Sequence, residues 1–134
     1  MKKFEVLEHR ADLKIKVFGQ DLAELFINAA SAIAEQQNPK AKKTTEEWES
    51  VEINSPDLNS LLVDWLNEIL SRSDLNHKIY FNFKIEELSE KHCRAKIAGQ
   101  KVVQKEIDIK AATYHGLEVK KVDEHWQAII IFDT

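Results

Sequence analysis

Apolar residues recur at the spacing of an α-helix in two stretches of the chain. In residues 21–36 they fall at i, i+3, i+4, i+7, i+8, i+11 and i+12, which places them on one face of a helix. Gly19 closes the preceding strand-like stretch, Asp21 is placed to act as N-cap, and Glu24 follows three residues later as in a capping box. The apolar positions of this predicted helix are Leu22, Leu25, Phe26, Ala29, Ala30, Ile33 and Ala34.

The second helical pattern covers residues 56–71 and has a similarly wide apolar face. Ser55 followed by Pro56 is the expected sequence of an N-cap and the first helical residue. Each of the two helices needs a sheet against which it can bury its apolar face. The apolar positions of this helix are Leu58, Leu61, Leu62, Trp65, Leu66, Ile69 and Leu70.

Elsewhere the apolar period shortens towards two, which is typical of strands that are packed on one face and solvated on the other. The order strand, helix, strand, helix and then several strands predicts an α+β fold, with two helices packed on one side of a mostly antiparallel or mixed β-sheet. The chain of 134 residues is expected to form one compact domain, 1–134. Residues 40–47 are polar, without a period, and are predicted to form a loop. The strand-like stretches are 4–7, 13–18, 51–53, 79–85, 94–98, 107–110, 117–120 and 126–132.

Composition and charge indicate a globular protein with one core and argue against several other classes of protein. The apolar fraction of 43% suffices for one core, and the net charge of −4 argues against extensive wrapping by nucleic acid. No apolar stretch resembles a signal peptide or reaches membrane-spanning length, so we expect no membrane association. The single cysteine, Cys93, excludes an intramolecular disulfide and fits a reducing, cytoplasmic location. Although His92 precedes Cys93, neighbours in a strand point to opposite faces, which disfavours a nucleophile–base pair.

The C-terminal stretch is apolar almost to its last residue and then carries a carboxylate, Asp133. A charge at the rim of a buried strand needs a cation, a donor or a proton. Asp12 lies between two strand-like stretches, where an aspartate commonly bonds its own backbone in a turn. The alternative interpretation is a metal site in which Asp12 and Asp133 both bind Ca²⁺ or Mg²⁺, with a main-chain or terminal oxygen of Thr134 as third ligand. The residues alone leave both interpretations open.

Asp64 and Glu68 form a second group of candidate residues. They are four residues apart in the second predicted helix and so lie beside its apolar stripe, with Asn67 further round on the solvent side. Paired carboxylates serve acid–base chemistry, and they also bond neighbouring backbone or a partner protein. Because no histidine or lysine is placed beside them by the sequence, the second role is favoured.

Residues 114–116, with the sequence Tyr-His-Gly, indicate a kink or bulge between two strands, because glycine accepts a positive φ that other residues resist. Such a bulge would direct His115 to a specific place, and a purely structural histidine is the alternative. The chain contains no Walker A, G-x-G-x-x-G, C-x-x-C, H-E-x-x-H or G-x-S-x-G motif, which disfavours a conventional nucleotide-using or hydrolytic enzyme.

Five sequence blocks, in order along the chain, resemble the archease family. They are L-E-H-x-A-D at 7–12, L-x-E-L-F-x-N-A-A at 22–30, L-L-V-D-W-L-N-E at 61–68, K-A-x-T-Y-H-G-L-E-V at 110–119 and I-F-D at 131–133. Archeases are small cytosolic cofactor proteins rather than enzymes. The resemblance implies that this protein activates an RNA ligase of the RtcB type, which joins tRNA halves and other broken RNAs. It would promote the GTP-dependent guanylylation of that ligase and sustain multiple turnover, and it would meet RNA only through the ligase.

The resemblance also implies a metal site made by Asp12, Asp133 and Thr134, which are two of the acids singled out above and their neighbour. Calcium is the expected ion, with magnesium and manganese as alternatives. We expect a monomer or weak oligomer. The alternative function is a chaperone-like docking module that modulates tRNA-modifying enzymes such as a tRNA methyltransferase, with Asp64, Glu68 and His115 meeting the partner.

Two departures from the family pattern bear on the metal and on the partner. Arg10 stands where a threonine is common, and its positive charge competes with a metal ion for Asp12. The link between Gly99 and Lys110 is shorter than usual and lacks the Arg-His pair that often occurs there.

Overall fold

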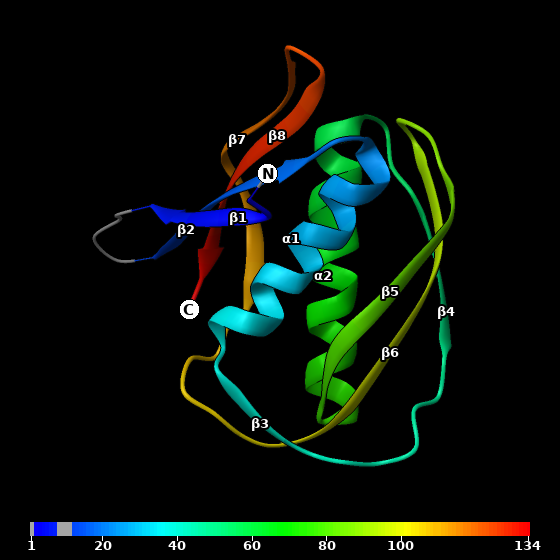
Figure 1. The fold of residues 1–134 in the computed structure, drawn as a ribbon, viewed down its shortest axis with the longest axis vertical. Coiled ribbons are helices and arrows are strands. Elements are labelled where there is room, and N and C mark those ends of the chain that lie inside the picture. The colour runs from blue at the N-terminus through cyan, green and yellow to red at the C-terminus, as the bar shows by residue number, and fades with distance from the viewer. Residues whose placement is uncertain (1, 8–11) are drawn as a thin grey trace.

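The computed structural model describes residues 2–7 and 12–134, which form two helices and eight strands (Figure 1). The elements are β1 (Phe4–Leu7), β2 (Leu13–Gly19), α1 (Leu22–Gln36), β3 (Pro39–Lys42), β4 (Glu49–Asn54), α2 (Leu58–Asn76), β5 (Lys78–Leu88), β6 (His92–Lys105), β7 (Ala111–Val122) and β8 (His125–Asp133).

The strands form two separate four-stranded sheets, and the helices lie between them (Figure 1). The terminal sheet has the order β1-β2-β8-β7 and joins both ends of the chain. In the central sheet, the long strand β6 pairs with β3, β4 and β5. Helix α1 contacts β2 and β5, while α2 contacts β7 and β5, so each helix bridges the two sheets.

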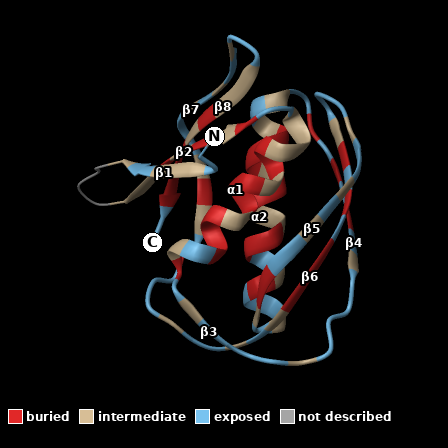
Figure 2. Cartoon of the chain, in the orientation of Figure 1, coloured by how far each residue is buried: buried red, intermediate tan, exposed pale blue. Residues whose placement is uncertain are grey.

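The predicted α+β class is confirmed, because two helices pack on strands whose described pairings are all antiparallel. The prediction that both helices cover one side of a single sheet is wrong. Each helix is buried on more than one side, and in α1 the small residues Ala29, Ala30 and Ala32 are fully buried. Small side chains let both sheets pack closely on α1. The width of its apolar stripe had not indicated a second packing face. Figure 2 shows the resulting core along both helices.

The start of α1 is as predicted. Asp21 is the N-cap, and its Oδ1 accepts a hydrogen bond of 2.8 Å from the N–H of Glu24. The Glu24 carboxylate in turn accepts from the N–H of Gln20 at 3.2 Å. This reciprocal pair satisfies two donors at the helix entrance and sets where the helix begins.

The boundaries predicted for α2 are wrong at both ends. The N-cap is Asp57, whose side chain accepts from the N–H of Ser60 at 2.7 Å, so Ser55 and Pro56 precede the helix. The helix continues five residues beyond the predicted end, to Asn76, where His77 adopts the left-handed conformation at φ 53°. Ser73 is buried in this added turn, and its hydroxyl donates to the carbonyl of Lys78. Tertiary contacts therefore prolong the helix past its apolar pattern.

Two strand predictions differ from the structure. Residues 39–42, predicted in part as loop, form β3 on β6. Residues 107–110, predicted as a strand, form an irregular link. Ile109 is buried there with the hydrophobic core, and its N–H donates to Oε1 of the buried Gln37 at 3.4 Å, so the link is anchored at this residue. Among the described residues, neither helix has the length and apolar character needed to cross a membrane.

Candidate functional site

The carboxylate end, as we name the group Asp12, Asp133 and Thr134, lies where β2 begins and β8 ends. The antiparallel register of these strands ends with Leu13 opposite Phe132. Asp12 precedes Leu13 and Asp133 follows Phe132, so the two acids are brought side by side at the same end of the terminal sheet. Asp12 is half-buried, whereas Asp133 and Thr134 are exposed. The register therefore places the two acids at the same end of the terminal sheet, and their binding of a common ion stays a prediction.

A third strand also reaches this end. Ala111 of β7 pairs with Asp133, and the N–H of Lys110 donates to the Asp133 carbonyl at 2.8 Å. Sequence analysis did not single out Lys110, which the structure places next to the carboxylate end. Its position as the first residue of the block at 110–119 was the available signal. Residues 8–11, which include Arg10, lie outside the described residues.

The donor atoms of the carboxylate end suit a hard divalent cation, because carboxylate and main-chain oxygens are the ligands that Ca²⁺ and Mg²⁺ prefer. Across residues 2–7 and 12–134 no group of three or more His, Cys, Asp or Glu side chains forms a metal cluster. A cation at this end would therefore draw further ligands from main-chain oxygen, such as that of Thr134, from water, or from a partner.

The bulge predicted around His115 is present in β7. The register jumps from Thr113 opposite Ile131 to Glu118 opposite Ile129, so residues 114–117 oppose Ile130 alone. Gly116 has φ 67°, which confirms the reason for glycine at this point. His115 is exposed on this bulge.

Asp64 connects the bulge to α2. Its Oδ1 accepts from the Tyr114 hydroxyl at 2.9 Å, and its Oδ2 accepts from the Ser55 hydroxyl at 2.6 Å. The hydrogen bond to Asp64 raises the pKa of the Tyr114 hydroxyl, with smaller contributions from burial and from the negative charge. Asp64 thus holds the neighbour of His115, and Ser55 serves this contact rather than capping the helix.

Glu68 is paired within the chain. Its carboxylate accepts from Nε of Arg72 at 2.7 Å, one helical turn away, and Nη1 of Arg72 also lies 3.6 Å from the Glu49 carboxylate. With Asp64 and Glu52, Glu68 lines an open groove of about 440 Å³ between α2 and β4. The groove presents carboxylates to solvent, and the described residues that line it include neither histidine nor lysine.

Asn67 does not point to solvent, and this prediction is wrong. Its Nδ2 donates to the carbonyl of Ala112 at 3.1 Å, and its Oδ1 accepts from the N–H of Ala112 at 2.7 Å. The helical-wheel position ignored β7, which crosses α2 at this turn. Side-chain amides match a free strand edge in geometry, since they offer one donor and one acceptor.

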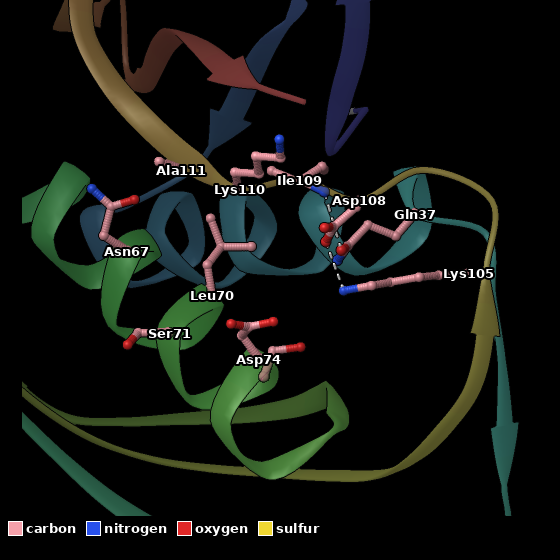
Figure 3. Close-up of a pocket in the computed structure, with 11 residues that line it drawn as sticks. Gln37, Asn67, Leu70, Ser71, Asp74, Lys105, Asp108, Ile109, Lys110 and Ala111 are labelled. Carbon is pink, nitrogen blue, oxygen red and sulfur yellow. Dashed lines mark hydrogen bonds and ion pairs between the residues drawn. The ribbon is translucent and has the colours of Figure 1, made fainter.

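A hollow of about 570 Å³ lies between the second half of α2 and the link 105–111 (Figure 3). Leu70 and Ile109 are buried beside it, and Asp74, Lys105 and Asp108 contribute charged groups. Lys105 pairs with Asp108 at 3.0 Å, so these charges offset each other. In Figure 3 the side chain of Lys110 points away from Asp74.

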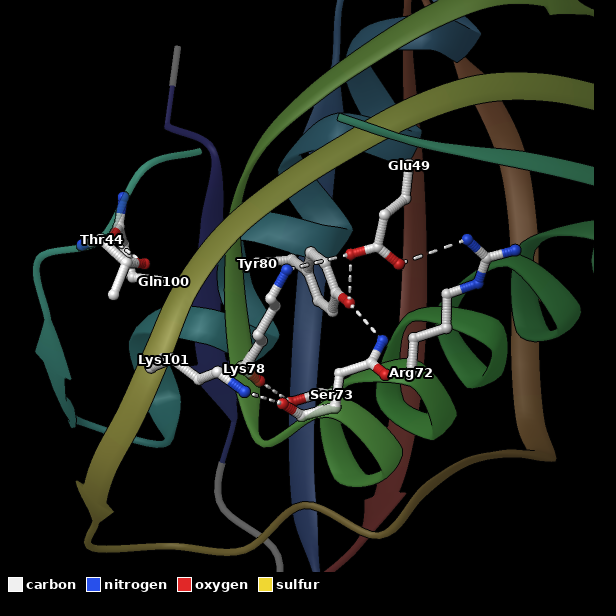
Figure 4. Close-up of polar contacts among 9 residues, drawn as sticks. Thr44, Glu49, Arg72, Ser73, Lys78, Tyr80, Gln100 and Lys101 are labelled. Carbon is white, nitrogen blue, oxygen red and sulfur yellow. Dashed lines mark hydrogen bonds and ion pairs between the residues drawn. The ribbon is translucent and has the colours of Figure 1, made fainter. Parts of the chain in front are cut away.

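Glu49 is the centre of a structural network at the far end of α2 (Figure 4). It accepts from the Tyr80 hydroxyl at 2.7 Å and lies 3.6 Å from both Arg72 and Lys78. Burial raises the pKa of Tyr80 to about 12, although a hydrogen bond from Asn76 lowers it. The tyrosine therefore stays protonated: its hydroxyl donates to Glu49 of β4 and accepts from Nδ2 of Asn76 at 3.1 Å, and the second bond ties the central sheet to the end of α2.

Cys93 is fully buried, and burial raises the pKa of its thiol to about 12. His92 points to the other face of β6, where its Nε2 lies 2.7 Å from the Glu52 carboxylate. A protonated thiol out of solvent is a poor nucleophile, which agrees with the prediction against catalysis by Cys93.

Comparison with known proteins identifies relatives along the whole chain. The model of the archease protein family matches residues 4–134. A protein archease from Methanosarcina acetivorans is 36% identical over 140 residues, covering 98% of this chain and 96% of the relative. One from Methanothermobacter thermautotrophicus is 33% identical, covering 99% of each.

Two solved structures have the same fold. The crystal structure of an archease from Thermotoga maritima, described as a possible chaperone, aligns with a TM-score of 0.72 at 21% identity and covers 96% of this chain and 94% of that chain. The solution structure of protein 1598 from Methanobacterium thermoautotrophicum aligns with a TM-score of 0.69 at 28% identity and covers 100% of both chains.

Proposed function

Since this chain belongs to the archease family, we propose that it is a metal-binding cofactor protein that activates an RtcB-type RNA ligase in tRNA splicing and RNA repair. It promotes the GTP-dependent guanylylation of the ligase and supports multiple turnover, and it is not an enzyme by itself. It works in the cytoplasm as a monomer or weak oligomer, without a membrane, and meets RNA only through the ligase.

The observation that carries this proposal is the register of β2 and β8, which brings Asp12 and Asp133 together at an exposed end of the terminal sheet. A bound divalent cation, Ca²⁺ or otherwise Mg²⁺ or Mn²⁺, supplies neutralisation of the negative charge that develops on phosphoryl oxygens. The terminal sheet positions these ligands. β2 and β8 hold the backbone next to the two carboxylates, and the Lys110 N–H donates to the Asp133 carbonyl.

The small number of ligands that Asp12, Asp133 and Thr134 offer is consistent with a metal ion that acts in a partner's active site. Two carboxylates and a main-chain oxygen leave coordination positions that GTP phosphates or the ligase can fill. The exposed position of Asp133 and Thr134 lets this end enter a cleft. In this proposal the residues Asp12, Asp133 and Thr134 hold the ion and orient it towards the nucleotide.

The direct test is guanylylation of the purified partner ligase by GTP, with and without this protein, in Ca²⁺, Mg²⁺ or Mn²⁺. We expect faster charging and repeated turnover when this protein is present, and no effect after chelation of divalent ions. A ligase that charges equally well without it would contradict the proposal. RNA and GTP incubated with this protein alone should remain unchanged, and turnover in that control would show an enzyme.

The second candidate function is a chaperone-like docking module for a tRNA-modifying enzyme such as a tRNA methyltransferase. The observation that favours it is the open acidic groove lined by Glu52, Asp64 and Glu68. The exposed His115 lies next to Tyr114, which contacts Asp64. In this alternative, Asp64, Glu68 and His115 meet the partner, and any ion at the carboxylate end is structural.

Glu68→Gln separates the two candidates. The Glu68–Arg72 pair is partly exposed, and such pairs contribute about 0.2–1 kcal/mol, so the fold should tolerate the change. Under the activator proposal we expect ligase binding within roughly fivefold of the parent, while chelation removes activation. Glu35→Gln, an exposed acid at the end of α1, controls for the loss of one charge. Should Glu68→Gln or Asp64→Asn weaken complex formation more than chelation does, the docking module is favoured instead.

A further inference from the structure

The first three residues of β7 form a short segment that depends on contacts outside its sheet. Residues 111–113 pair with β8, but the irregular link lies before them and the bulge at residues 114–117 follows them. Three pairs at a sheet edge provide little cooperative stability. β7 is an edge strand of the terminal sheet, so β8 is its only neighbouring strand within residues 2–7 and 12–134.

Asn67 occupies the position that a further strand would take. Both backbone groups of Ala112 are satisfied by its amide, at 3.1 Å to the carbonyl and 2.7 Å from the N–H. Asn67 itself lies in the middle of α2, directly after the fully buried Leu66 and one turn after the fully buried Val63. A rigid helix thereby sets the position of the short segment.

The segment in turn supports Asp133. Ala111 pairs with Asp133, and the N–H of the preceding Lys110 donates to the Asp133 carbonyl at 2.8 Å. β2 holds the other side of β8 as far as the pair Leu13–Phe132, next to Asp12. The separation of the two acids is therefore set by β2 on one side and by the segment anchored at Asn67 on the other.

We propose that Asn67 is a positioning residue for the carboxylate end, acting from α2 through Ala112 and Ala111 on Asp133. The expected effect of Asn67 on divalent-cation affinity rests on the proposed function, in which the carboxylate end binds a metal ion. Partners that orient metal ligands without touching the ion typically contribute about 10–100-fold in affinity. Because Asn67 acts through two intervening residues, we expect the lower part of that range.

The test compares Asn67→Ala with Asn28→Ala in the isolated chain. Asn28 is a matched control because its buried amide also joins a helix to a strand carbonyl, that of Phe18 at 2.8 Å, near the opposite end of β2. Calcium titration calorimetry gives cation affinity, and amide hydrogen exchange of Lys110 and Ala112 reports the strand segment. We expect Asn67→Ala to weaken calcium binding about tenfold and to expose both amides to exchange. Asn28→Ala should change neither, even if its melting temperature falls.

Asn67→Asp keeps the acceptor for the Ala112 N–H but loses the donor to the carbonyl, so it should give an intermediate effect if Asn67→Ala fails to fold. Equal calcium affinity and equal amide protection in the parent and both Asn67 variants would overturn the inference. If the parent itself binds no divalent cation, the metal part of the proposed function fails. Unchanged exchange of Lys110 in the variants would then overturn the positioning role on its own.

Discussion

Replacing Asp133 with alanine is expected to abolish activation of the partner ligase. The change removes one of the two carboxylates that the register of β2 and β8 brings together, and a main-chain oxygen remains as its only donor. Changes to residues that only orient a metal ligand cost about 10–100-fold in metal affinity, so loss of a ligand itself should weaken calcium binding by at least about 100-fold. Calorimetry on the isolated chain and guanylylation of the ligase measure the two consequences. Asp12→Ala should have the same effects.

The matched control is Glu124→Ala, in the exposed turn between β7 and β8. It removes the same charge from the same pair of strands, but at the opposite end from Asp133. We expect calcium binding and ligase activation close to those of the parent. If Asp133→Ala and Asp12→Ala both activate the ligase as well as the parent does, the carboxylate end has no role in activation.

Trp65→Ala should cause the largest loss of stability. Trp65 is fully buried between the helices and the central sheet, and its indole N–H donates to the Phe26 carbonyl at 3.0 Å. Its ring lies 6.3 Å from that of Phe26 and 6.2 Å from that of Phe83. Truncation leaves a cavity and removes the indole hydrogen bond, so we expect a decrease of about 3–5 kcal/mol in the free energy of unfolding. Urea denaturation followed by circular dichroism measures it.

Trp48→Ala provides the comparison at an exposed tryptophan. Its side chain is 41% exposed and contacts the Lys84 ammonium, which lies 4.4 Å from the ring centroid. A cation–π contact at such a site contributes about 0.5–1 kcal/mol. A loss for Trp65→Ala no larger than that for Trp48→Ala would mean that Trp65 does not organise the core.

The accurate predictions were those that depended on backbone conformation or on hydrogen bonds between residues close in sequence. The cap at Asp21 needs only a side-chain oxygen within reach of Glu24, and this contact spans three residues. The bulge at Gly116 similarly follows from the positive φ that glycine accepts. The start of α2 was wrong because two cap residues competed, and Asp57 offers a carboxylate at the correct spacing from Ser60. The Ser55 hydroxyl instead donates a hydrogen bond to the Asp64 carboxylate, and this contact forms only once the helix has folded.

The candidate site was predicted only in part for the same reason. The sequence showed two acids at the ends of strand-like stretches, and the resemblance to archeases joined them. The position of Lys110 beside Asp133 and the role of Asn67 at Ala112 were missed. Neither has a periodic signal, since each is a backbone contact between segments more than twenty residues apart.

By itself, then, the sequence determined the two amphipathic helices, the alternating strands, the bulge before Leu117 and the acids near both ends. These follow from the spacing of side chains along one segment and from hydrogen bonds within a few residues. Only the tertiary structure decided the division into two sheets, the pairing of Leu13 with Phe132 and the anchoring of β7 by Asn67. Strand register is chosen by burial of whole faces across distant segments, and a shift of one residue would turn every side chain to the other face.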